Sequence, residues 1–351
     1  MEEITFRPIA QKDIEDYIPI HEEIFRLKRD LKLGFKLAKW FSEAKGMGYA
    51  ARCAGRLVGI YAVIPLEVMV ENRKKLFREV ISIAVVEGFR NRGIFQELGR
   101  RTFRDIGPLE DKSAIMVFPS KPSLKTQCNH LSSRLILRIR RYVKPLNFYA
   151  LTYEKKRPFL LKVFFFGGSL LLTPLVGLKN WTKKRPLAGL ELRRRDKIPD
   201  DYEAFWEEAN KKYPIVVVRS REFLQWRFFE EPQGANEFYE ARLENELVGY
   251  CVVKLRHKNL DIVDFFCIRK ENIISGIFYE IARLACKRGA WRLYMRIHDN
   301  YLENLLAEEK FTVDDSRAMI LVNTDSNDAE FLRLLDKAEL WYITDNSVLL
   351  G

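Results

Sequence analysis

The chain has 351 residues, of which 47% are hydrophobic and 31% are charged, and its formal net charge is +12. This globular composition, without enrichment in Pro or Gly, excludes disordered and fibrous classes. The length predicts two domains of roughly 150 residues each. The five cysteines are odd in number and widely spaced, and the four histidines lack the spacing of metal ligands. We therefore predict a reduced, cytoplasmic protein that has no disulfide framework and binds no metal.

The excess positive charge lies in one segment. Residues 134–195 contain 16 of the 60 Lys and Arg residues but only two of the 48 acidic ones, Glu154 and Glu191. That segment has a net charge of +14, and the rest of the chain is close to neutral at −2. A protein that binds nucleic acid needs a basic face across its domains, so this distribution disfavours nucleic acid as a partner.

The N-terminal half has the pattern of an α/β fold. Residues 49–63 (YAARCAGRLVGIYAV) alternate as two strands around a polar turn, which predicts a β-hairpin. The β-branched run Val80–Val86 predicts another strand, and a bend at residues 90–93 follows it. A helical pattern then begins at Ile94. The apolar run Ala114–Ser120 predicts a last strand before a further helix.

The second half repeats this order of elements. Residues 239–253 (YEARLENELVGYCVV) match residues 49–63 at seven of fifteen positions, at a fixed offset of 190. GIFYEI at Gly276–Ile281 likewise resembles GIFQEL at Gly93–Leu98. Matches in the same order favour a duplication over two unrelated hairpins that share common strand residues.

A tryptophan precedes each hairpin, Trp40 in the first half and Trp226 in the second. We therefore predict two tandem domains. The N-terminal domain covers residues 1–150, a linker covers residues 151–189, and the C-terminal domain covers residues 190–351.

The bend and the strand before it carry a family resemblance. RNRGIF at Arg90–Phe95 resembles the Q/R-x-x-G-x-G/A pyrophosphate loop of the GNAT-type N-acyltransferases, and Ile83–Val86 resembles the strand end whose backbone pairs with the pantetheine arm. The resemblance covers residues 1–145 and, more weakly, residues 190–325. The tandem arrangement is similar to that of double-GNAT proteins of cell-surface polysaccharide pathways.

The resemblance implies an α/β fold with a mixed sheet, in two tandem GNAT-like domains joined by a basic, apolar, helical linker. It also implies acetyl-CoA or another acyl-CoA as the co-substrate, and no metal. The residues that it assigns to the acyl-CoA are Ala84, Val85, Val86, Arg90, Asn91, Arg92, Gly93, Ile94 and Phe95.

The chemistry of the bend agrees with this assignment. A pyrophosphate needs several converging backbone N–H donors, and a bend that opens a helix supplies them together with the positive end of the helix dipole. Gly93 lets the backbone approach without a Cβ, and Arg90 and Arg92 add charge-assisted contacts. The alternative is a solvated turn between a strand and a helix.

Two features depart from the family pattern. Phe95 stands where the motif prefers Gly or Ala, so its side chain has to turn into the core, away from the phosphates. In the second half, Ile273 and Ser275 stand in the places of Arg90 and Arg92. We therefore expect one active site per chain, with a second, degenerate domain that completes the acceptor cleft or packs on the first domain.

Acyl transfer to an amine needs a base, donors for the developing oxyanion and a proton source for the thiolate. Glu79 and Ser82 are the candidate catalytic residues on the strand before the bend, and Glu79 is the better base. The alternative is that Glu79 is an exposed strand residue. Backbone amides near Ala84 would polarise the thioester carbonyl. The next helix lacks the tyrosine that the family often uses as an acid, so Cys128 or His130 either replaces it or has a capping or surface role.

The segment Lys155–Pro186 is both basic and apolar. Its run Phe159–Leu178 is about as long as a membrane span, but Lys162, a Gly-Gly pair and Pro174 interrupt it, and a span would place the two halves in opposite compartments. Two predictions remain. The segment packs between the domains, or it dips into an anionic membrane surface at the cytoplasmic side.

The sequence therefore predicts an N-acyltransferase, most simply an acetyltransferase, that acts on a small-molecule amine such as an amino sugar or a cell-surface precursor. One alternative is a Fem-type aminoacyl transferase, which the confined positive charge disfavours. Another is a non-catalytic tandem module, which Phe95 and the missing tyrosine favour.

Overall fold

The structure is a computed structural model of the chain and describes most of both halves. The described residues are 3–17, 19–20, 39–106, 114–119, 121–131, 133–146, 187–231, 236–322 and 329–344. The predicted linker, residues 151–189, lies outside them except for its last three residues.

The N-terminal half consists of strands and helices in the predicted order. Its strands are β1 (Ile4–Pro8), β2 (Met47–Cys53), β3 (Arg56–Val70), β4 (Arg73–Val85), β5 (Ile115–Val117) and β6 (Ser133–Pro145). Its helices are α1 (Gln11–Glu15), the 3-10 turn η1 (Glu87–Phe89), α4 (Ile94–Ile106) and α5 (Lys121–His130). The helix predicted from Ile94 begins at that residue, whereas β4 begins seven residues before the predicted strand and β5 is shorter than its prediction.

The C-terminal half follows the same plan and adds elements at its end. Its strands are β7 (Leu190–Arg195), β8 (Ile215–Val217), β9 (Asn236–Leu243), β10 (Glu246–Arg256), β11 (Asn259–Cys267), β12 (Arg292–His298), β13 (Thr312–Val322) and β14 (Trp341–Thr344). Its helical segments are α8 (Tyr202–Ala209), η2 (Asn210–Lys212), α9 (Arg221–Leu224), the π-helical turn η3 (Gln225–Phe229), α10 (Glu271–Lys287), α11 (Asn300–Glu308), α12 (Ala329–Leu335) and η4 (Ala338–Leu340).

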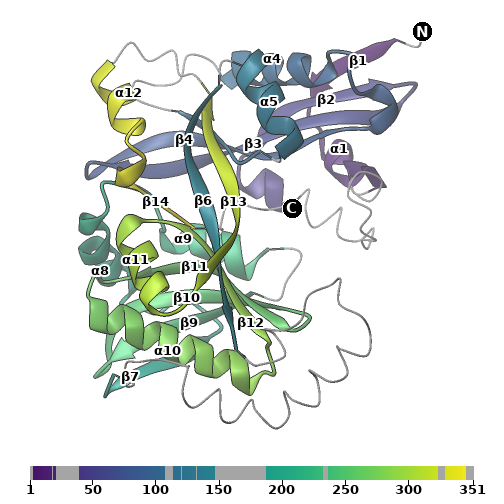
Figure 1. Cartoon of the computed structure of the whole chain (residues 1–351). Helices are drawn as coiled ribbons and strands as arrows, with labels where there is room; N and C mark the ends of the chain where they lie inside the picture. The colour runs from purple at the N-terminus through teal and green to yellow at the C-terminus, as the bar shows by residue number, and fades with distance from the viewer. Residues whose placement is uncertain are drawn as a thin grey trace.

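The described strands form one mixed sheet that passes through both halves without a break. Its order is β1-β2-β3-β4-β5-β13-β6-β12-β11-β10-β9-β7, and β8 and β14 link β3 to β12 beside this path. β13 lies between β5 and β6, and β6 lies between β13 and β12. Each half therefore contributes one strand that pairs with strands of the other half. These two strands, β6 and β13, run side by side through the middle of the molecule (Figure 1). The boundaries at residues 150 and 190 stay a prediction.

Both halves carry the same irregularities at matching positions. The β2–β3 register shifts at Val58, and the β9–β10 register shifts at Val248, which is 190 residues later. β4 has an extra residue, Ile81, against β3, and β11 has an extra residue, Val263, against β10. A bulge of this kind bends its strand and changes its twist. In both halves the bulged strand then separates from its parallel neighbour.

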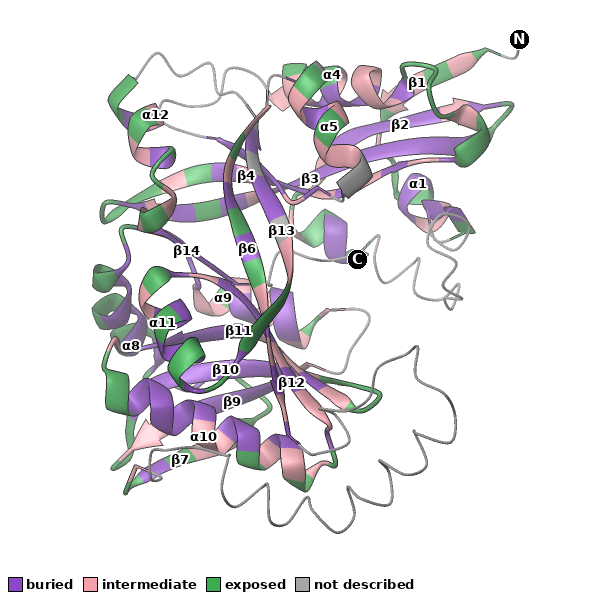
Figure 2. Cartoon of the chain, viewed as in Figure 1, coloured by how far each residue is buried: buried purple, intermediate pink, exposed green. Residues whose placement is uncertain are grey.

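The helices cover the sheet with narrow apolar stripes. α4 buries Ile94, Leu98, Gly99 and Thr102, which recur at helical spacing, and packs on β2 and β3. α10 buries a wider stripe over β7, β11 and β12, and Figure 2 shows buried and exposed residues alternating along this helix. None of the described helices is long and apolar enough to cross a membrane. The segment 155–186, which we expect at a domain or membrane interface, lies outside the described residues.

Candidate functional site

The bend between β4 and α4 exposes backbone donors at the start of a helix. Asn91 and Gly93 have left-handed φ angles of +61° and +76°. The amides of Phe89 and Arg90 bond to carbonyls of the preceding turn. The amides from Asn91 to Phe95 have no acceptor among the described residues. These donors therefore remain available for an anionic ligand at the positive end of the α4 dipole.

The two arginines of the bend lie at the surface. Arg90 donates from Nε to the carbonyl of Val85, at 3.1 Å, and Arg92 lies over the ring of Phe89 at 5.1 Å. Neither guanidinium has an ion pair within the described part of the chain. Phe95 packs inward against Tyr61, with ring centroids 6.0 Å apart. The amide side of the bend is therefore left clear of its side chain.

The strand before the bend has one open edge. β3 pairs with β4 as far as Val85, and the amide of Val86 continues this pairing to the carbonyl of Val58 at 3.0 Å. On the other side, β5 pairs only with Arg78–Val80. From the bulge at Ile81 onward, that edge of β4 has no strand partner among the described residues. The Val85 carbonyl on this edge accepts from Arg90 Nε at 3.1 Å. The remaining N–H and C=O groups of the edge can pair with an extended ligand chain.

The same bulge brings the two candidate catalytic residues to one face. Without it, residues three apart on a strand would face opposite sides. Glu79 pairs with Ile64 and Ser82 pairs with Ala62, and these two partners lie two residues apart on β3 and pack in one cluster. The structure therefore brings Glu79 and Ser82 together, over the cluster that also contains Trp40.

Glu79 is buried, with 4% of its surface exposed, so the alternative of an exposed strand residue is wrong. Burial raises the pKa of Glu79 to about 8, and the charge of Arg227 opposes that rise. Within the described residues, Glu79 Oε1 and the buried Ser82 Oγ have no hydrogen-bond partner. Buried polar atoms without partners are costly, and such an arrangement is typical of a site that meets a ligand.

Comparisons with known proteins agree with this geometry. Residues 5–127 match the family model described as an acetyltransferase (GNAT) domain. A GCN5-related N-acetyltransferase of Anabaena variabilis has a similar structure, with a TM-score of 0.61, 11% identity, and coverage of 92% of this chain and 73% of that one. The chain has the GNAT acyltransferase fold. No curated protein sequence matches it.

Two further solved structures share the GNAT fold. The N-myristoyltransferase of Saccharomyces cerevisiae with bound myristoyl-CoA has a TM-score of 0.58 and 12% identity, covering 92% of this chain and 83% of that one. The glucosamine N-acetyltransferase region of a fungal multi-domain β-N-acetylglucosaminidase has a TM-score of 0.56 and 12% identity, covering 92% of this chain and 38% of that one. At these identities the likeness concerns the fold.

In the second half of the chain, a helix takes the place of the bend at residues 90–93. α10 begins at Glu271, so Ile273 and Ser275 are buried inside a helix rather than placed in a loop. Gly276 serves packing, because a Cβ there would come within 2.7 Å of Leu190 Cδ2. The short turn before this helix carries Arg269, but its guanidinium pairs with Asp299 at 2.9 Å.

The edge of β11 that corresponds to the open edge of β4 is occupied by the protein itself. The hydroxyl of Tyr342, on β14, donates to the carbonyl of Phe265, and the hydroxyl of Tyr213 donates to the carbonyl of Cys267 at 3.4 Å. Beside them, Asp264 accepts from Arg219 at 3.0 Å and from Tyr250 at 2.7 Å. The described part of the second half therefore offers no comparable open edge.

Sequence reasoning missed two buried residues near the candidate site. Arg227, on η3, is buried and acts on Glu79 from 148 positions away in the sequence. Tyr61 is buried on the α4 side of β3, where Gln127 on α5 donates to its hydroxyl at 3.3 Å and burial raises the pKa of the phenol. Of the two candidate acids, Cys128 packs with the apolar cluster beside α4, and the side chain of His130 lies outside the described part.

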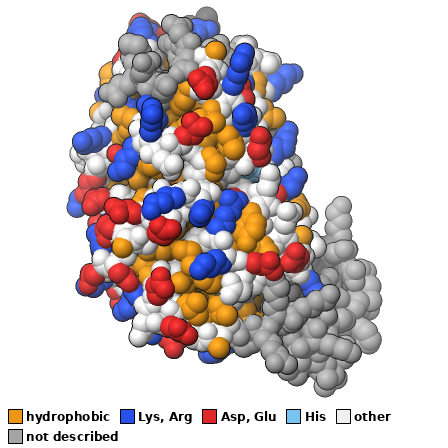
Figure 3. Space-filling view, turned by 90° about the vertical axis from the view of Figure 1, so that its left-hand side faces the viewer, with side chains coloured by type: hydrophobic (Ala, Val, Ile, Leu, Met, Phe, Trp, Pro, Cys, Tyr) orange, Lys and Arg blue, Asp and Glu red, His pale blue; other side chains and the backbone are white. Residues whose placement is uncertain are grey.

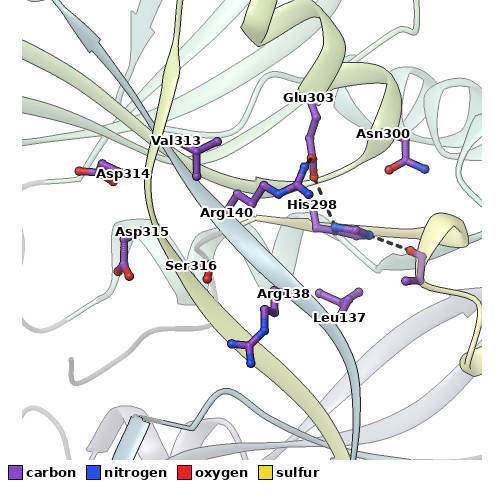
Figure 4. A pocket seen from close by; sticks show the side chains of 11 residues that line it. Leu137, Arg138, Arg140, His298, Asn300, Glu303, Val313, Asp314, Asp315 and Ser316 are labelled. Atoms are coloured by element: carbon purple, nitrogen blue, oxygen red, sulfur yellow. Dashed lines mark hydrogen bonds and ion pairs between the residues drawn. The ribbon is translucent and has the colours of Figure 1, made fainter.

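A cavity of about 560 Å³ lies between β6, β13 and α11 (Figure 4). Its lining residues are far in the sequence from the bend at residues 90–93. On its wall, Glu303 accepts hydrogen bonds from Arg140 at 2.7 Å and Tyr142 at 2.8 Å, and its other oxygen lies 3.3 Å from His298 Nδ1. Burial alone would raise the pKa of Glu303, but these partners outweigh it and lower the pKa. The cluster braces α11 on β6. No residue of the bend or of β4 lines this cavity.

Charges of both signs mix over the face shown in Figure 3. Lys and Arg side chains alternate there with Asp and Glu, and apolar patches lie between them. That face has no continuous basic field.

Proposed function

We propose that the N-terminal half transfers an acyl group from acyl-CoA to a small-molecule amine. The observation that carries this proposal is the junction, among the described residues, of a β4 edge without a strand partner and a bend whose amides lack acceptors at the N-terminus of α4. A ligand with an extended amide-bearing arm and a diphosphate matches both features. Acyl-CoA has that chemistry, and it supplies a thioester that an amine can attack.

The residues of this half have complementary roles in the proposal. The amides from Asn91 to Phe95, with Arg90 and Arg92, bind the diphosphate. The β4 edge at Ala84–Val86 holds the arm and orients the thioester, and Glu79 takes the proton from the amine, directly or through water. Ser82, whose hydroxyl is also buried beside Glu79, orients the amine or that water.

The acceptor and the acyl chain follow from weaker support. The fungal neighbour named as a glucosamine N-acetyltransferase region supports an amino sugar or a related cell-surface precursor. The myristoyl-CoA bound by the yeast neighbour makes chains longer than acetyl worth testing. A cytoplasmic protein whose segment 155–186 contacts an anionic membrane surface would meet lipid-linked precursors there, and co-sedimentation with anionic vesicles at low salt tests this part separately.

Isothermal calorimetry with acetyl-CoA and then myristoyl-CoA tests the proposal. We expect saturable binding that an Arg90→Ala, Arg92→Ala pair weakens. The same pair of substitutions at Arg193 and Arg194, on the remote strand β7, removes equal charge and serves as the control. If neither acyl-CoA binds at millimolar concentration, the transferase function is wrong and the non-catalytic module remains.

A further inference from the structure

The second half brings a buried arginine to the side of the sheet that carries the candidate base of the first half. Arg227 has 5% of its surface exposed and lies on η3, Gln225–Phe229. This turn is π-helical, and the amide of Glu230 bonds to the carbonyl of Gln225 at 3.1 Å. Single π-helical turns are uncommon and are often found at functional sites. Here the turn sends Arg227 and Phe228 inward.

A pair of tryptophans fixes this turn to the first half. The rings of Trp40 and Trp226 stack with centroids 4.1 Å apart and planes inclined by 9°. Each indole N–H also donates to the backbone carbonyl of the other residue, at 2.9 Å and 3.1 Å. Trp226 immediately precedes Arg227, so this reciprocal contact fixes the backbone from which the Arg227 side chain extends.

The contact lies under the face that carries Glu79 and Ser82. Trp40 and Trp226 pack in the same apolar cluster as Ala62 and Ile64, the residues paired with Ser82 and Glu79 on β3. On β5, the partner of Glu79 is Met116. The neighbouring strands thus give Glu79 no charge, and among the described residues the charge that acts on it is that of Arg227.

A carboxyl group in these surroundings cannot easily lose its proton. Desolvation penalises the carboxylate, and a nearby cation restores part of the lost stabilisation. A carboxyl takes a proton from an amine only at a pH where it is ionised, so a lower pKa widens the pH range in which Glu79 can act as a base. The charge of Arg227 therefore lowers the pH from which Glu79 can act as a base.

We propose that Arg227 is a positioning residue for acyl transfer: its guanidinium, brought in by the second half, stabilises the ionised form of the Glu79 carboxyl within the buried site of the first half. This inference rests on the proposed function. It gives the half without a pyrophosphate loop a specific role, since that half completes the site at the end where the amine is deprotonated.

The first test follows the ionisation of Glu79 without any assay of activity. The free energy of unfolding is measured across pH for the chain and for Glu79→Gln, and the upper inflection of their difference marks the folded-state titration of Glu79. We expect Arg227→Met to move this inflection upward by about one pH unit or more. Arg227→Lys keeps the positive charge, so its inflection should lie close to that of the unsubstituted chain. Arg227→Gln serves in its place if the Met variant does not fold.

Arg221→Met is the matched control, because Arg221 lies on the neighbouring α9 and pairs with Glu203 at 2.7 Å. It should leave the inflection unchanged. An inflection that stays in place in both Arg227→Met and Arg227→Gln overturns the proposal.

The second test uses the pH profile of kcat/KM for the acyl transfer. Its acidic limb should move upward in Arg227→Met by the same interval as the inflection, while KM for acyl-CoA is unchanged. A uniform loss of rate at every pH, with no shift of the limb, overturns the positioning role and leaves the transferase function intact. A shifted inflection in a chain that binds no acyl-CoA overturns the transferase function and leaves the coupling of Arg227 to Glu79 standing.

Discussion

Gly93 offers the sharpest test of the bend. Its φ of +76° lies in the left-handed region, and a Cβ built on it would meet no atom within 4 Å. Gly93→Ala therefore introduces no clash, and its cost is the conformational penalty of a non-glycine residue, about 1–2 kcal/mol. The chain either accepts this strain or relieves it by rotating the bend.

Either response changes what the bend presents to a ligand. A rotated peptide turns the amides of Gly93 and Ile94 away from their common target, and each such donor is worth about 1–3 kcal/mol to a charged partner. We expect Gly93→Ala to weaken acyl-CoA binding by about tenfold or more. Gly93→Asn should weaken it less, because asparagine tolerates the left-handed region.

A second glycine provides the control. Gly289, in the turn between α10 and β12, has a φ of +66° and equally open surroundings. Gly289→Ala should lower the free energy of unfolding by a similar amount and leave acyl-CoA binding unchanged. Denaturant titration gives the stabilities, and calorimetry gives the affinities. If Gly93→Ala binds acyl-CoA as tightly as Gly289→Ala does, the bend does not hold the diphosphate.

Three other predictions concern burial and packing. Because the folded carboxyl of Glu79 holds its proton up to about pH 8, its contribution to stability is complete below about pH 4.5 and is lost as pH rises to 8. The difference in the free energy of unfolding between the chain and Glu79→Gln should therefore change by about 1.4 kcal/mol per pH unit in that window. A difference that stays constant across the window would refute the buried titration. Trp40→Ala and Trp226→Ala should each cost about 3–5 kcal/mol, and the double variant should cost clearly less than their sum in a denaturant cycle, since each removes the same stack. Tyr342→Phe should cost about 1–3 kcal/mol by leaving the Phe265 carbonyl unpaired, with no change in calorimetric binding of acyl-CoA.

Local patterns in the sequence predicted the local structure of the first half well. The hairpin at residues 49–63 and the helix from Ile94 depend on alternation, on helical spacing and on a glycine whose left-handed φ ends one element and starts another. Each of these signals lies within a few residues of what it determines. The start of α10 was harder to place, because the run GIF continues a helix that begins five residues earlier, at Glu271.

Contacts between distant segments were not predictable in the same way. The strands β6 and β13 have ordinary strand patterns, and nothing local indicates that each would pair with the other half. The sequence showed that Trp40 and Trp226 each precede a hairpin in the repeated order of elements. Their positions did not indicate that the two rings stack on each other. Arg227 reads as a solvated arginine between aromatic residues until the fold brings it beside Glu79.

The placement of Glu79 and Ser82 shows how an irregularity can decide function. Strict alternation would send the side chains of residues 79 and 82 to opposite faces of β4, and only one of them would reach a common ligand. The extra residue at Ile81 corrects the phase, and the same extra residue turns β4 away from β5 and leaves its edge open. The second half has the corresponding extra residue at Val263, and there the edge of β11 is closed by Tyr342 and Tyr213. The bulge alone therefore does not make a site. What separates the two halves is how the chain meets the edge that the bulge exposes. In the second half two buried tyrosines close it, whereas in the first half the described residue that bonds to it is an exposed arginine, Arg90, through the Val85 carbonyl.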